Sequence, residues 1–588
     1  MKKRIVFNSR ILPDNFLVSG AVFTLVFTAM RSLILKTFLF VSAIAALPLI
    51  AEEKPADMRT FIDGELAAGK KEIVVPKGRY YTTPKDGTHL WFKNLSDVTV
   101  KAYGAELICT QTIAAIRIEN CKNLRIEGLV IDYDPLPYTQ GKIVSMSDDK
   151  MNFEVEIFEG YGDVKNIEWG DRLEIFDQNT RRLKVNTYGG YKLEKLSDMK
   201  FRLTKPEWAR QIPFQNEEVG DIIALSMPSS EHAGGHGVYC TDSKGVVFKD
   251  VTMYSSPAFG FWEGECDANV YDNVKITRRD TGDFKKRANP RIRSLNADGF
   301  HSTAAIKGPT FLNCETGWNG DDSIAINGLY YLVYSGDSSA LRVAARGNKF
   351  GFTVGDRIEI YRPDGSVKYA KITSIKKSHP VTKEEMDWFK TQRVYPAFIK
   401  WNTFFRDAYE IALDAEIDIP RRSMILNTAK MGNGFKIKGG KFGNNRSRGL
   451  IIKSGNGVID GATIEAAWME SIKIAPEWFW FEGGHTENLT IKNCKILCGS
   501  GPAISINSPA ADEKTFSEAG ANNNIKIINN TFKYVSMPVV FATSVNDLKM
   551  AKNKFDLMDE GFYVFVNPSH MGVECSEPVK LINCQQKD

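Results

Sequence analysis

After residue 50 the chain has no apolar run of the roughly 20 residues that a membrane-spanning helix needs. It also lacks an excess of charge. Six of the 76 Lys and Arg residues and one of the 71 Asp and Glu residues lie before residue 52, so 70 residues of each sign remain after it. A nucleic-acid-binding protein needs a concentrated basic surface. The balance of charge therefore argues against nucleic acid as a partner.

The chain also lacks a recognisable metal-binding pattern of cysteines. It has nine cysteines, and the closely spaced pair Cys494 and Cys498 is not accompanied by a second Cys or His pair at zinc-binding spacing. Most of the nine lie in apolar, strand-like runs, as Cys109 and Cys240 do, so we expect buried free thiols. The sequence predicts no metal site and no cofactor.

The first 51 residues differ from the rest. Basic residues precede an apolar run at 16–30, and further basic residues precede a second run at 37–50. The second run has the length of a signal-peptide core, so we expect cleavage near Ala51, with Met1 or Met30 as the true start. The expected destination is periplasmic, cell-surface or secreted. The alternative is a membrane anchor formed by both runs, which the intervening basic residues disfavour.

Short segments recur in which a turn residue precedes alternating apolar positions and then Asn, Asp or Gly. Examples lie at 122–128, 487–493 and 524–530. Alternation directs the Leu, Ile and Val side chains inward, and Asn and Gly suit the left-handed backbone of sharp bends. The spacing drifts between 23 and 36 residues because the loops differ in length. We therefore predict an all-β fold, a right-handed parallel β-helix whose coils pack on one another.

Two stretches interrupt the repeat, and we predict that each is a small inserted β-barrel. Both contain the phrase Gly-Asp-Arg, an apolar residue, Glu and Ile, at 170–175 and at 355–360. Helices are expected at 57–68, as an end cap, and at 381–391. The predicted segments are a leader at 1–51, a cap with the first coils at 52–134, the first barrel at 135–228, further coils at 229–328, the second barrel at 329–422 and a C-terminal β-helix at 423–588.

Three aspartates carry the best clue to chemistry. The hexapeptide Asn-Ala-Asp-Gly-Phe-His contains Asp298, and the pentapeptide Asn-Gly-Asp-Asp-Ser contains Asp321 and Asp322; the two segments begin 23 residues apart, about one coil. A single Asp-Gly turn is common in a β-helix for conformational reasons. Adjacent carboxylates repel, however, which raises one pKa and keeps a carboxylic acid protonated near neutral pH. We expect Gly320 to form a turn or bulge that lets both neighbouring aspartates face one site.

Such a cluster suits the hydrolysis of a glycosidic bond. One carboxylic acid can protonate the glycosidic oxygen while a carboxylate activates water on the other face of the sugar. Because the chain after the leader is formally neutral, a neutral oligosaccharide or glycoconjugate is the expected substrate. The sequence leaves open whether the protein forms a homo-oligomer.

With these motifs, residues 55–588 resemble glycoside hydrolase family 110, bacterial exo-acting α-1,3-galactosidases that remove the terminal galactose of blood group B-type glycans. The resemblance implies a β-helix with two small barrels and implies that Asp298, Asp321 and Asp322 are the catalytic carboxylates. It further implies inversion at the anomeric carbon, with carboxyl groups roughly 6.5–9.5 Å apart. We assign Asp321 as the general acid, and Asp298 and Asp322 as the residues that hold the attacking water. Linear Gal-α1,3-Gal is a second possible substrate.

Three alternatives remain. Polygalacturonases, glycoside hydrolase family 28, also pair Asn-x-Asp with Asp-Asp, but there a Gly-His-Gly and an Arg-x-Lys follow, whereas here the Gly-His-Gly around His236 precedes both acidic segments. Arg448 and Lys453 could serve a galacturonate carboxylate, although they lie in a run typical of an ordinary strand. The second alternative is a non-catalytic β-helix that binds glycans. The third, a calcium-dependent lyase, lacks an acidic cluster with an evident arginine partner.

Further residues are candidates for binding the sugar. Histidine and glutamate side chains can hydrogen-bond to hydroxyl groups, and tryptophan can stack on the apolar C–H face of galactose. The aromatic run at 476–484 is denser than one solenoid turn requires. The substrate-binding candidates are His236, His301, Trp318, Glu477, Trp478, Trp480 and Glu482.

Overall fold

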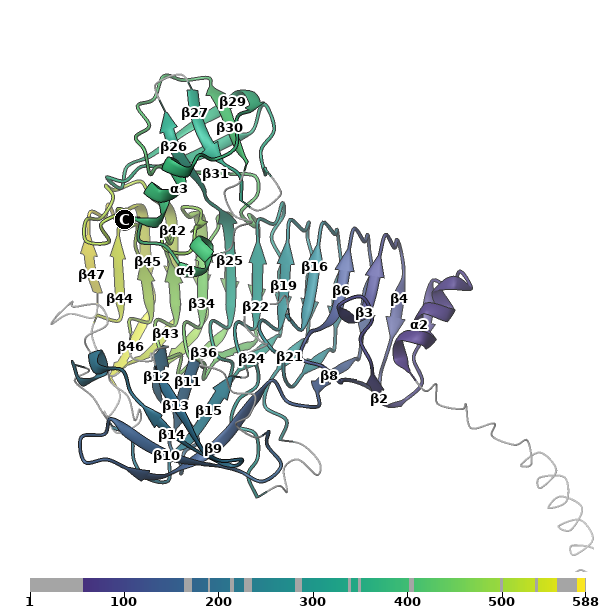
Figure 1. Ribbon diagram of the computed structural model, residues 1–588. Coiled ribbons are helices and arrows are strands. Elements are labelled where there is room, and N and C mark those ends of the chain that lie inside the picture. The colour runs from purple at the N-terminus through teal and green to yellow at the C-terminus, as the bar shows by residue number, and fades with distance from the viewer. Residues whose placement is uncertain are drawn as a thin grey trace, which may run out of the picture. The chain divides into compact units, whose positions relative to one another are not determined.

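Three long parallel sheets form the main body of the protein in the computed structural model (Figure 1). The structure describes residues 57–162, 172–188, 191–211, 216–226, 235–280, 288–336, 340–346, 350–400, 407–497, 501–534, 538–557 and 579–586. The predicted leader at 1–51 lies outside these residues. Residues Pro55–Asp588 form one compact unit.

Each coil of the solenoid contributes one short strand to each sheet, and corresponding strands of successive coils pair in parallel. The first sheet contains, in order, β1 (Glu72–Val74), β4 (Thr99–Lys101), β7 (Arg125–Glu127), β17 (Val247–Lys249), β20 (Val270–Asp272), β23 (Thr310–Leu312), β32 (Lys436–Lys438), β35 (Val458–Asp460), β39 (Glu487–Lys492), β42 (Asn522–Ile528) and β45 (Val545–Ala551). The second sheet contains β2 (Gly78–Thr82), β5 (Ala105–Cys109), β8 (Val130–Tyr133), β18 (Thr252–Met253), β21 (Lys275–Ile276), β24 (Glu315–Gly317), β33 (Lys441–Gly443), β36 (Thr463–Glu465), β40 (Lys495–Leu497), β43 (Thr531–Tyr534) and β46 (Lys554–Leu557).

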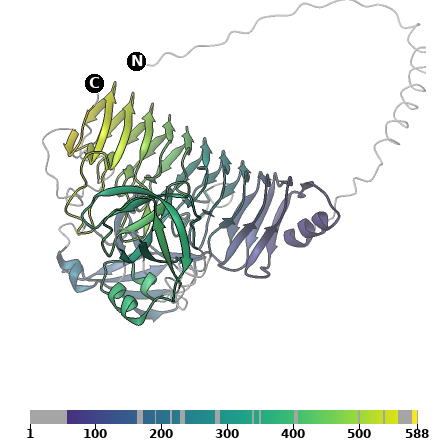
Figure 2. The same ribbon diagram turned by 90° about the horizontal axis from the view of Figure 1, so that it is seen from above.

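The third sheet carries the candidate site. It contains β3 (Thr88–Lys93), β6 (Ala114–Glu119), β16 (Val238–Thr241), β19 (Phe261–Gly264), β22 (Phe300–Thr303), β25 (Ile324–Leu329), β34 (Leu450–Lys453), β37 (Ile472–Ile474), β41 (Ile504–Ile506), β44 (Val540–Thr543) and β47 (Val579–Ile582). A twelfth strand, β38 (Glu482–Gly483), pairs antiparallel with the end of β25. The predicted parallel β-helix is thus confirmed, and Figure 2 shows the successive coils from above.

Asparagines occupy the bends, as the repeat predicts. Asn456, Asn488 and Asn524 have φ values of 51°, 56° and 49°, in the left-handed region. Their side chains form a ladder, because Asn488 donates to Asn456 at 2.9 Å and Asn524 donates to Asn488 at 2.7 Å. Inside the coils, the inward-facing residues form one hydrophobic cluster that runs from Met58 to Leu548.

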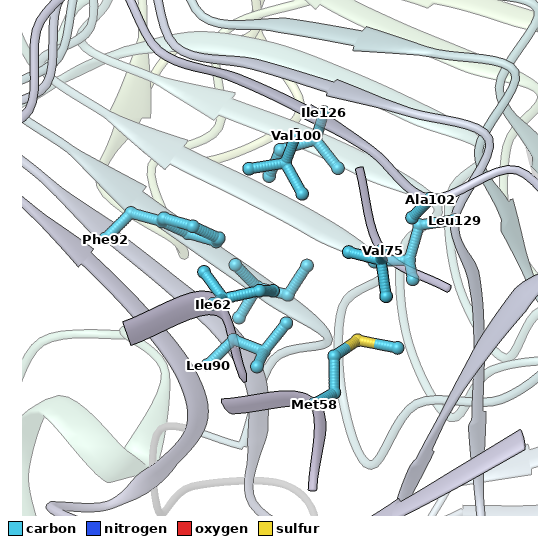
Figure 3. A pocket seen from close by; sticks show the side chains of 10 residues that line it. Met58, Ile62, Val75, Leu90, Phe92, Val100, Ala102, Ile126 and Leu129 are labelled. Carbon is cyan, nitrogen blue, oxygen red and sulfur yellow. The ribbon is translucent and has the colours of Figure 1, made fainter. Parts of the chain in front are cut away.

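Helix α2 (Met58–Ala67) lies at the start of this cluster, which confirms the predicted cap. Asp57 caps the helix by accepting a hydrogen bond from the Thr60 backbone at 2.9 Å. Figure 3 shows Met58 and Ile62 of the helix beside Leu90 and Phe92 of β3. The helix thereby covers the apolar interior that the first coil would otherwise expose.

The first insert differs from its prediction. Its described strands form a seven-stranded antiparallel sheet in the order β12 (Leu183–Tyr188), β11 (Arg172–Phe176), β15 (Ile222–Ser226), β9 (Tyr138–Met146), β10 (Asn152–Ile157), β14 (Lys200–Thr204) and β13 (Lys192–Ser197). Among these described strands β12 and β13 do not pair with each other, so the sheet stays open. β13 is a mostly exposed edge strand. A 3₁₀ helix, η2, spans Glu207–Gln211.

The second insert is a closed barrel, as predicted. Around the barrel its strands are β26 (Tyr331–Gly336), β27 (Ala340–Ala344), β30 (Ala408–Leu413), β29 (Val367–Lys377), β28 (Arg357–Tyr361) and β31 (Met424–Asn427). The helix expected at 381–391 is α3 (Lys383–Lys390), which Thr382 and Glu385 stabilise with a capping box. A short helix, α4 (Pro396–Lys400), follows.

Seven of the nine cysteines are described, and all seven are free thiols. Six are buried and Cys584 is half-buried. Within the described part of the chain, no helix has the length and apolar character required to cross a bilayer.

Candidate active site

Asp298 and Asp322 occupy equivalent positions on neighbouring coils. Each lies two residues before a strand of the third sheet, because β22 begins at Phe300 and β25 begins at Ile324. Phe300 and Ile324 pair in register, and the Gly299 backbone N–H donates to the Asp322 carbonyl at 2.9 Å. The parallel register therefore places the two segments that sequence analysis singled out side by side.

The turn at 319–322 is fixed by a close approach and by a side-chain amide. A Cβ atom on Gly320 would meet the Asn296 carbonyl oxygen at 2.4 Å, so only glycine fits there. Gly320 is not itself left-handed; Trp318, with φ of 66°, makes the left-handed bend. The Asn319 side-chain amide donates to the carbonyl oxygens of Ala297, Asp321 and Asp322, at 3.2, 2.9 and 2.9 Å.

The three carboxylates converge. One oxygen from each of Asp298, Asp321 and Asp322 lies within 4.8 Å of the others. This nearest-oxygen spacing is tighter than the roughly 6.5–9.5 Å expected between the two carboxyl groups of an inverting pair. Burial and the two neighbouring carboxylates raise the pKa of Asp298 to about 7, despite a hydrogen bond from His301 that lowers it. Burial also raises the pKa of Asp322, against the lowering effect of Arg448.

Two arginines bind the paired aspartates: Arg446, which sequence analysis did not mention, and Arg448, which it considered only as a partner for a galacturonate carboxylate. Arg446 Nη2 donates to Asp321 Oδ2 at 2.7 Å. Arg448 donates its backbone N–H to Asp322 Oδ1 at 2.7 Å, and its guanidinium lies 3.2 Å from Oδ2. Leu450 pairs with Ile324, so Arg448 occupies on the next coil the position that Asp322 occupies on its own. Extending the repeat register to this coil is the sequence signal that would have identified it.

His301 lies between two acids. Its Nδ1 is 2.7 Å from Asp298 Oδ2, and its Nε2 is 3.7 Å from Glu482 Oε1. Burial lowers the pKa of His301, but Asp298 and Glu482 outweigh it and raise the pKa above its ordinary value. The imidazole is therefore placed to hold a proton next to Asp298.

Glu477 and Glu482 share the buried Lys453. Lys453 Nζ lies 2.7 Å from Glu477 and 2.5 Å from Glu482, and its side chain is 1% exposed. Arg448 also contacts Glu477, at 2.5 Å. Burial would raise the pKa of Glu477, but the neighbouring cations hold it well below its usual range. Both glutamates are carboxylates that complete an ion-pair network beside Asp322 and His301.

His236 belongs to an aromatic stack that ends at the site. Its ring stacks on Phe259 with centroids 4.6 Å apart, and Phe259 stacks on His301 at 4.8 Å. Burial, together with the charge on His301, lowers the pKa of His236 to about 3. His236 is thus a neutral ring that supports His301 through Phe259.

The predicted tryptophans lie in different surroundings. Trp478 is 3% exposed and donates its indole N–H to the Pro509 carbonyl at 2.9 Å, so it belongs to the hydrophobic core and not to a sugar platform. Trp480 is half-buried and packs on Tyr395, with centroids 4.4 Å apart. The guanidinium of Arg278 covers the Trp318 ring at 3.5 Å. The dense aromatic run at 476–484 therefore contributes to the packing of the protein.

Three carboxylate oxygens at this spacing also suit a hard divalent cation. The guanidinium groups of Arg446 and Arg448, however, already neutralise two of the three acids. The site therefore combines two buried acids with raised pKa values, Asp298 and Asp322, with Asp321, which Arg446 binds, and with His301, whose pKa is also raised. These are the groups that glycoside hydrolysis requires.

Comparison with known proteins points to the same chemistry. Alpha-1,3-galactosidase B of Bacteroides thetaiotaomicron is 22% identical over 539 residues, which cover 82% of this chain and 80% of the relative. Alpha-1,3-galactosidase A of Bacteroides fragilis is 22% identical over 570 residues, covering 88% and 87%. Alpha-1,3-galactosidase B of Phocaeicola vulgatus is 20% identical over 557 residues, covering 85% and 88%. No family model matches the chain.

Solved structures resemble the chain only distantly. The A-module of a mannuronan C-5 epimerase from Azotobacter vinelandii has a TM-score of 0.39 at 9% identity and covers 91% of this chain and 98% of its own. The endo-xylogalacturonan hydrolase of Aspergillus tubingensis has a TM-score of 0.36 at 10% identity, covering 90% and 97%. Likeness at this level carries no argument about function. The relatives that align over most of the chain, together with the carboxylate cluster, support a glycoside hydrolase.

Proposed function

We propose that the protein is an exo-acting, inverting glycoside hydrolase of family 110 that removes terminal α-1,3-linked galactose. The observation that carries the glycoside hydrolase is the convergence of Asp298, Asp321 and Asp322 within 4.8 Å. Inversion rests on the resemblance to family 110 and not on this spacing, which is tighter than that of an inverting pair. The names of the relatives support the α-1,3-galactosyl linkage. Proposed substrates are blood group B-type glycans and linear Gal-α1,3-Gal. Export through the segment at 1–51 would bring the enzyme to such glycans.

In the proposed mechanism Asp321 protonates the glycosidic oxygen, and Asp298 and Asp322 hold the water that attacks the anomeric carbon. Asp321 has the most exposed side chain of the three, at 17% against 6% for Asp298 and 9% for Asp322. Carboxyl groups this close share protons as a set, so the proton that the raised pKa of Asp298 retains near pH 7 belongs to the cluster. His301 keeps Asp298 oriented.

The covering of the third sheet supports exo action. Along β16 the outward positions are half-buried, whereas every residue of β22 and of β34 is buried. On β34 the outward-facing Lys453 is 1% exposed, because the segment that includes Glu477 and β38 crosses over it. A long polymer therefore has no continuous open face along these strands, which favours attack on a chain end.

The test is galactose release from a blood group B trisaccharide and from linear Gal-α1,3-Gal, with the anomer followed by NMR. Release of β-galactose by the wild type, abolished in Asp321→Asn, is the expected result. Initial release of α-galactose would overturn inversion. No release from either substrate by a folded protein would overturn the galactosidase, and binding without turnover would then favour a glycan-binding protein.

A pectin hydrolase is the second candidate, because the fold and the Asp-Asp pair would also suit it. Galacturonate needs a cation for its carboxylate. Arg448 already binds Asp322 and Glu477, and Lys453 already binds Glu477 and Glu482. This internal pairing favours a neutral sugar. Release of galacturonate from polygalacturonan in the same assay would reverse that preference.

A further inference from the structure

The two inserts carry the same short phrase, and its glutamate occupies the same place in both. Glu174 is the middle residue of β11 and Glu359 is the middle residue of β28. Each is 1% exposed. A buried glutamate is costly unless it is paired and hydrogen-bonded, so each needs a partner. In both inserts that partner belongs to a solenoid segment that leads to the candidate site.

Glu174 binds the segment that carries Asp298. Arg293, which is fully buried, donates from Nε to Glu174 Oε2 at 2.7 Å. Its Nη1 donates to Ser226 Oγ of the same insert at 2.7 Å and to Asn296 Oδ1 at 3.0 Å. The backbone carbonyl of Asn296 in turn lies close against Gly320, where it leaves no room for a Cβ atom. The first insert thus holds both the approach to Asp298 and the support of the Asp321 turn.

Glu359 binds the segment that carries Glu482. Its Oε1 is 2.9 Å from His485 Nδ1, and its Oε2 accepts the His485 backbone N–H at 3.0 Å. Tyr330 donates its hydroxyl to Oε1 at 2.9 Å. Burial would raise the pKa of Glu359, but His485 and these hydrogen bonds lower it below its usual value. Glu359 is therefore a charged anchor for the chain just after β38.

The two anchored segments meet at His301. Its Nδ1 contacts Asp298, on the segment that the first insert holds, at 2.7 Å. Its Nε2 lies 3.7 Å from Glu482, on the segment that the second insert holds. The distance between Asp298 and Glu482 across the imidazole is therefore set from both sides by insert glutamates.

We propose that Glu174 and Glu359 are positioning residues, through which the two inserts fix the Asp298–His301–Glu482 array. The role in turnover rests on the proposed glycoside hydrolase function. Neither glutamate touches substrate or reacting atoms in this proposal. Each acts through a buried partner, Arg293 or His485.

The test compares Glu174→Gln and Glu359→Gln with Glu217→Gln. Glu217 forms an equally buried ion pair with Lys205 inside the first insert, so its variant reproduces the loss of a buried charge pair away from the array. We expect kcat to fall roughly 10- to 100-fold in the first two variants, with KM changing less than about threefold, because small misplacements of catalytic groups act on the transition state. Glu217→Gln should lower the unfolding temperature without this fall in kcat.

A second readout does not need activity. The pKa of His301 is measured by NMR of histidine-labelled protein, with His301→Gln assigning the signal. The charged and titratable groups facing the ring are Asp298, Glu482 and Lys453, with His236 beyond Phe259. Loosening either segment weakens the contacts that raise the pKa, so it should fall by about 0.5 unit or more in both Gln variants. It should stay unchanged in Glu217→Gln.

These results separate the two proposals. A wild type that releases no galactose would overturn the galactosidase, while the His301 titration would still decide the positioning role. An active wild type whose Gln variants match Glu217→Gln in kcat and in the His301 pKa would overturn the positioning role. If a Gln variant does not fold, Ser226→Ala and Tyr330→Phe remove one hydrogen bond each from the same anchors and are judged by the same criteria.

Discussion

The Asp298 carboxyl links the stability of the fold to pH. Burial raises its pKa to about 7, whereas an aspartate in an unfolded chain titrates near 3.9. Between these values the folded protein binds the additional proton, so this contribution to stability is lost as the pH rises through the window. Asp298→Asn removes the charge and keeps an oxygen that accepts from His301. We expect it to raise the free energy of unfolding by about 2–4 kcal/mol at pH 8 and by less than about 1 kcal/mol at pH 4, measured by denaturant titration.

The neighbouring aspartate provides the control. Asp321→Asn leaves the buried Arg446 with a weaker partner, so we expect it to destabilise the protein at pH 8. A loss of stability in Asp298→Asn at pH 8 would contradict the assignment of a raised pKa to Asp298.

If Asp321 is the general acid, the loss of activity on replacing it should depend on the leaving group of the substrate. A sugar leaving group needs a proton, whereas a nitrophenolate leaves without one. We expect Asp321→Asn to lose roughly 10²- to 10⁴-fold in kcat/KM on the disaccharide but far less on an activated aryl α-galactoside. Asp322→Asn, which disturbs the water, should lose activity on both substrates. If Asp298→Asn, and not Asp321→Asn, keeps its activity on the aryl galactoside while losing it on the disaccharide, then Asp298 is the general acid.

At the scale of the elements, the turn between β24 and β25 holds two coils together through Gly320. Alanine there would place a Cβ atom 2.4 Å from the Asn296 carbonyl oxygen, so one of the two catalytic segments must move. We expect Gly320→Ala to lower kcat at least about 10²-fold, since displacements of about 1 Å can cost that much. Steady-state kinetics with a circular-dichroism check of the fold measures this.

Gly64→Ala is the control for Gly320→Ala. Gly64 lies inside α2, and a Cβ atom there would meet nothing within 4 Å. Gly64→Ala should stabilise the protein by roughly 0.5–1 kcal/mol and leave kcat unchanged. Equal kinetic effects of the two alanines would show that the close approach at Gly320 is unimportant.

The secondary-structure elements also show which parts of the fold and of the site can be predicted from the sequence alone. Strand alternation and bend asparagines such as Asn488 predict the β-helix because each repeat has the same local physics. The spacing of one coil predicts that Asp298 and Asp322 meet. Arg446 was not predicted, because its role depends on a partner 125 residues away that no local pattern reveals. Trp478 was misassigned because aromatic density does not distinguish a platform from a core, and closure of the first insert depends on whether its edge strands meet.

At the scale of the whole molecule, the site depends on long-range assembly. The coil of Asp322 is followed by the entire barrel before β34 returns with Arg448 to pair beside β25. The ion pairs of the site therefore join residues on both sides of an insert, and removing an insert changes the connection between two adjacent coils. The first insert leaves the solenoid between β8 and β16 and contacts the segment of Asp298 through Glu174 and Arg293, whereas the second follows β25 directly. Their antiparallel sheets can thus support segments that the parallel solenoid alone leaves at its surface.

The end of the solenoid makes the last prediction. Ile62 of α2 is 2% exposed and belongs to the apolar cluster that continues through the coils. Aspartate at this position would bury an unpaired charge, which typically costs about 3–5 kcal/mol. Because each coil is stabilised mainly by its neighbours, Ile62→Asp should loosen the first coils, up to Cys109, before those of β22 and β25. Hydrogen exchange should therefore accelerate first in β1 to β5, while kcat at low temperature is retained.

Ala67→Asp places the same charge on the exposed side of the same helix and should change stability by only a few tenths of a kcal/mol. A uniform rise in exchange across all coils of Ile62→Asp would instead mean that the solenoid unfolds as a single cooperative unit. The active-site coils would then share the stability of the cap. Faster exchange in the first coils alone would mean that the carboxylate cluster does not depend on the N-terminal end. Its rigidity would then come from the adjoining coils and from the two inserts that hold them.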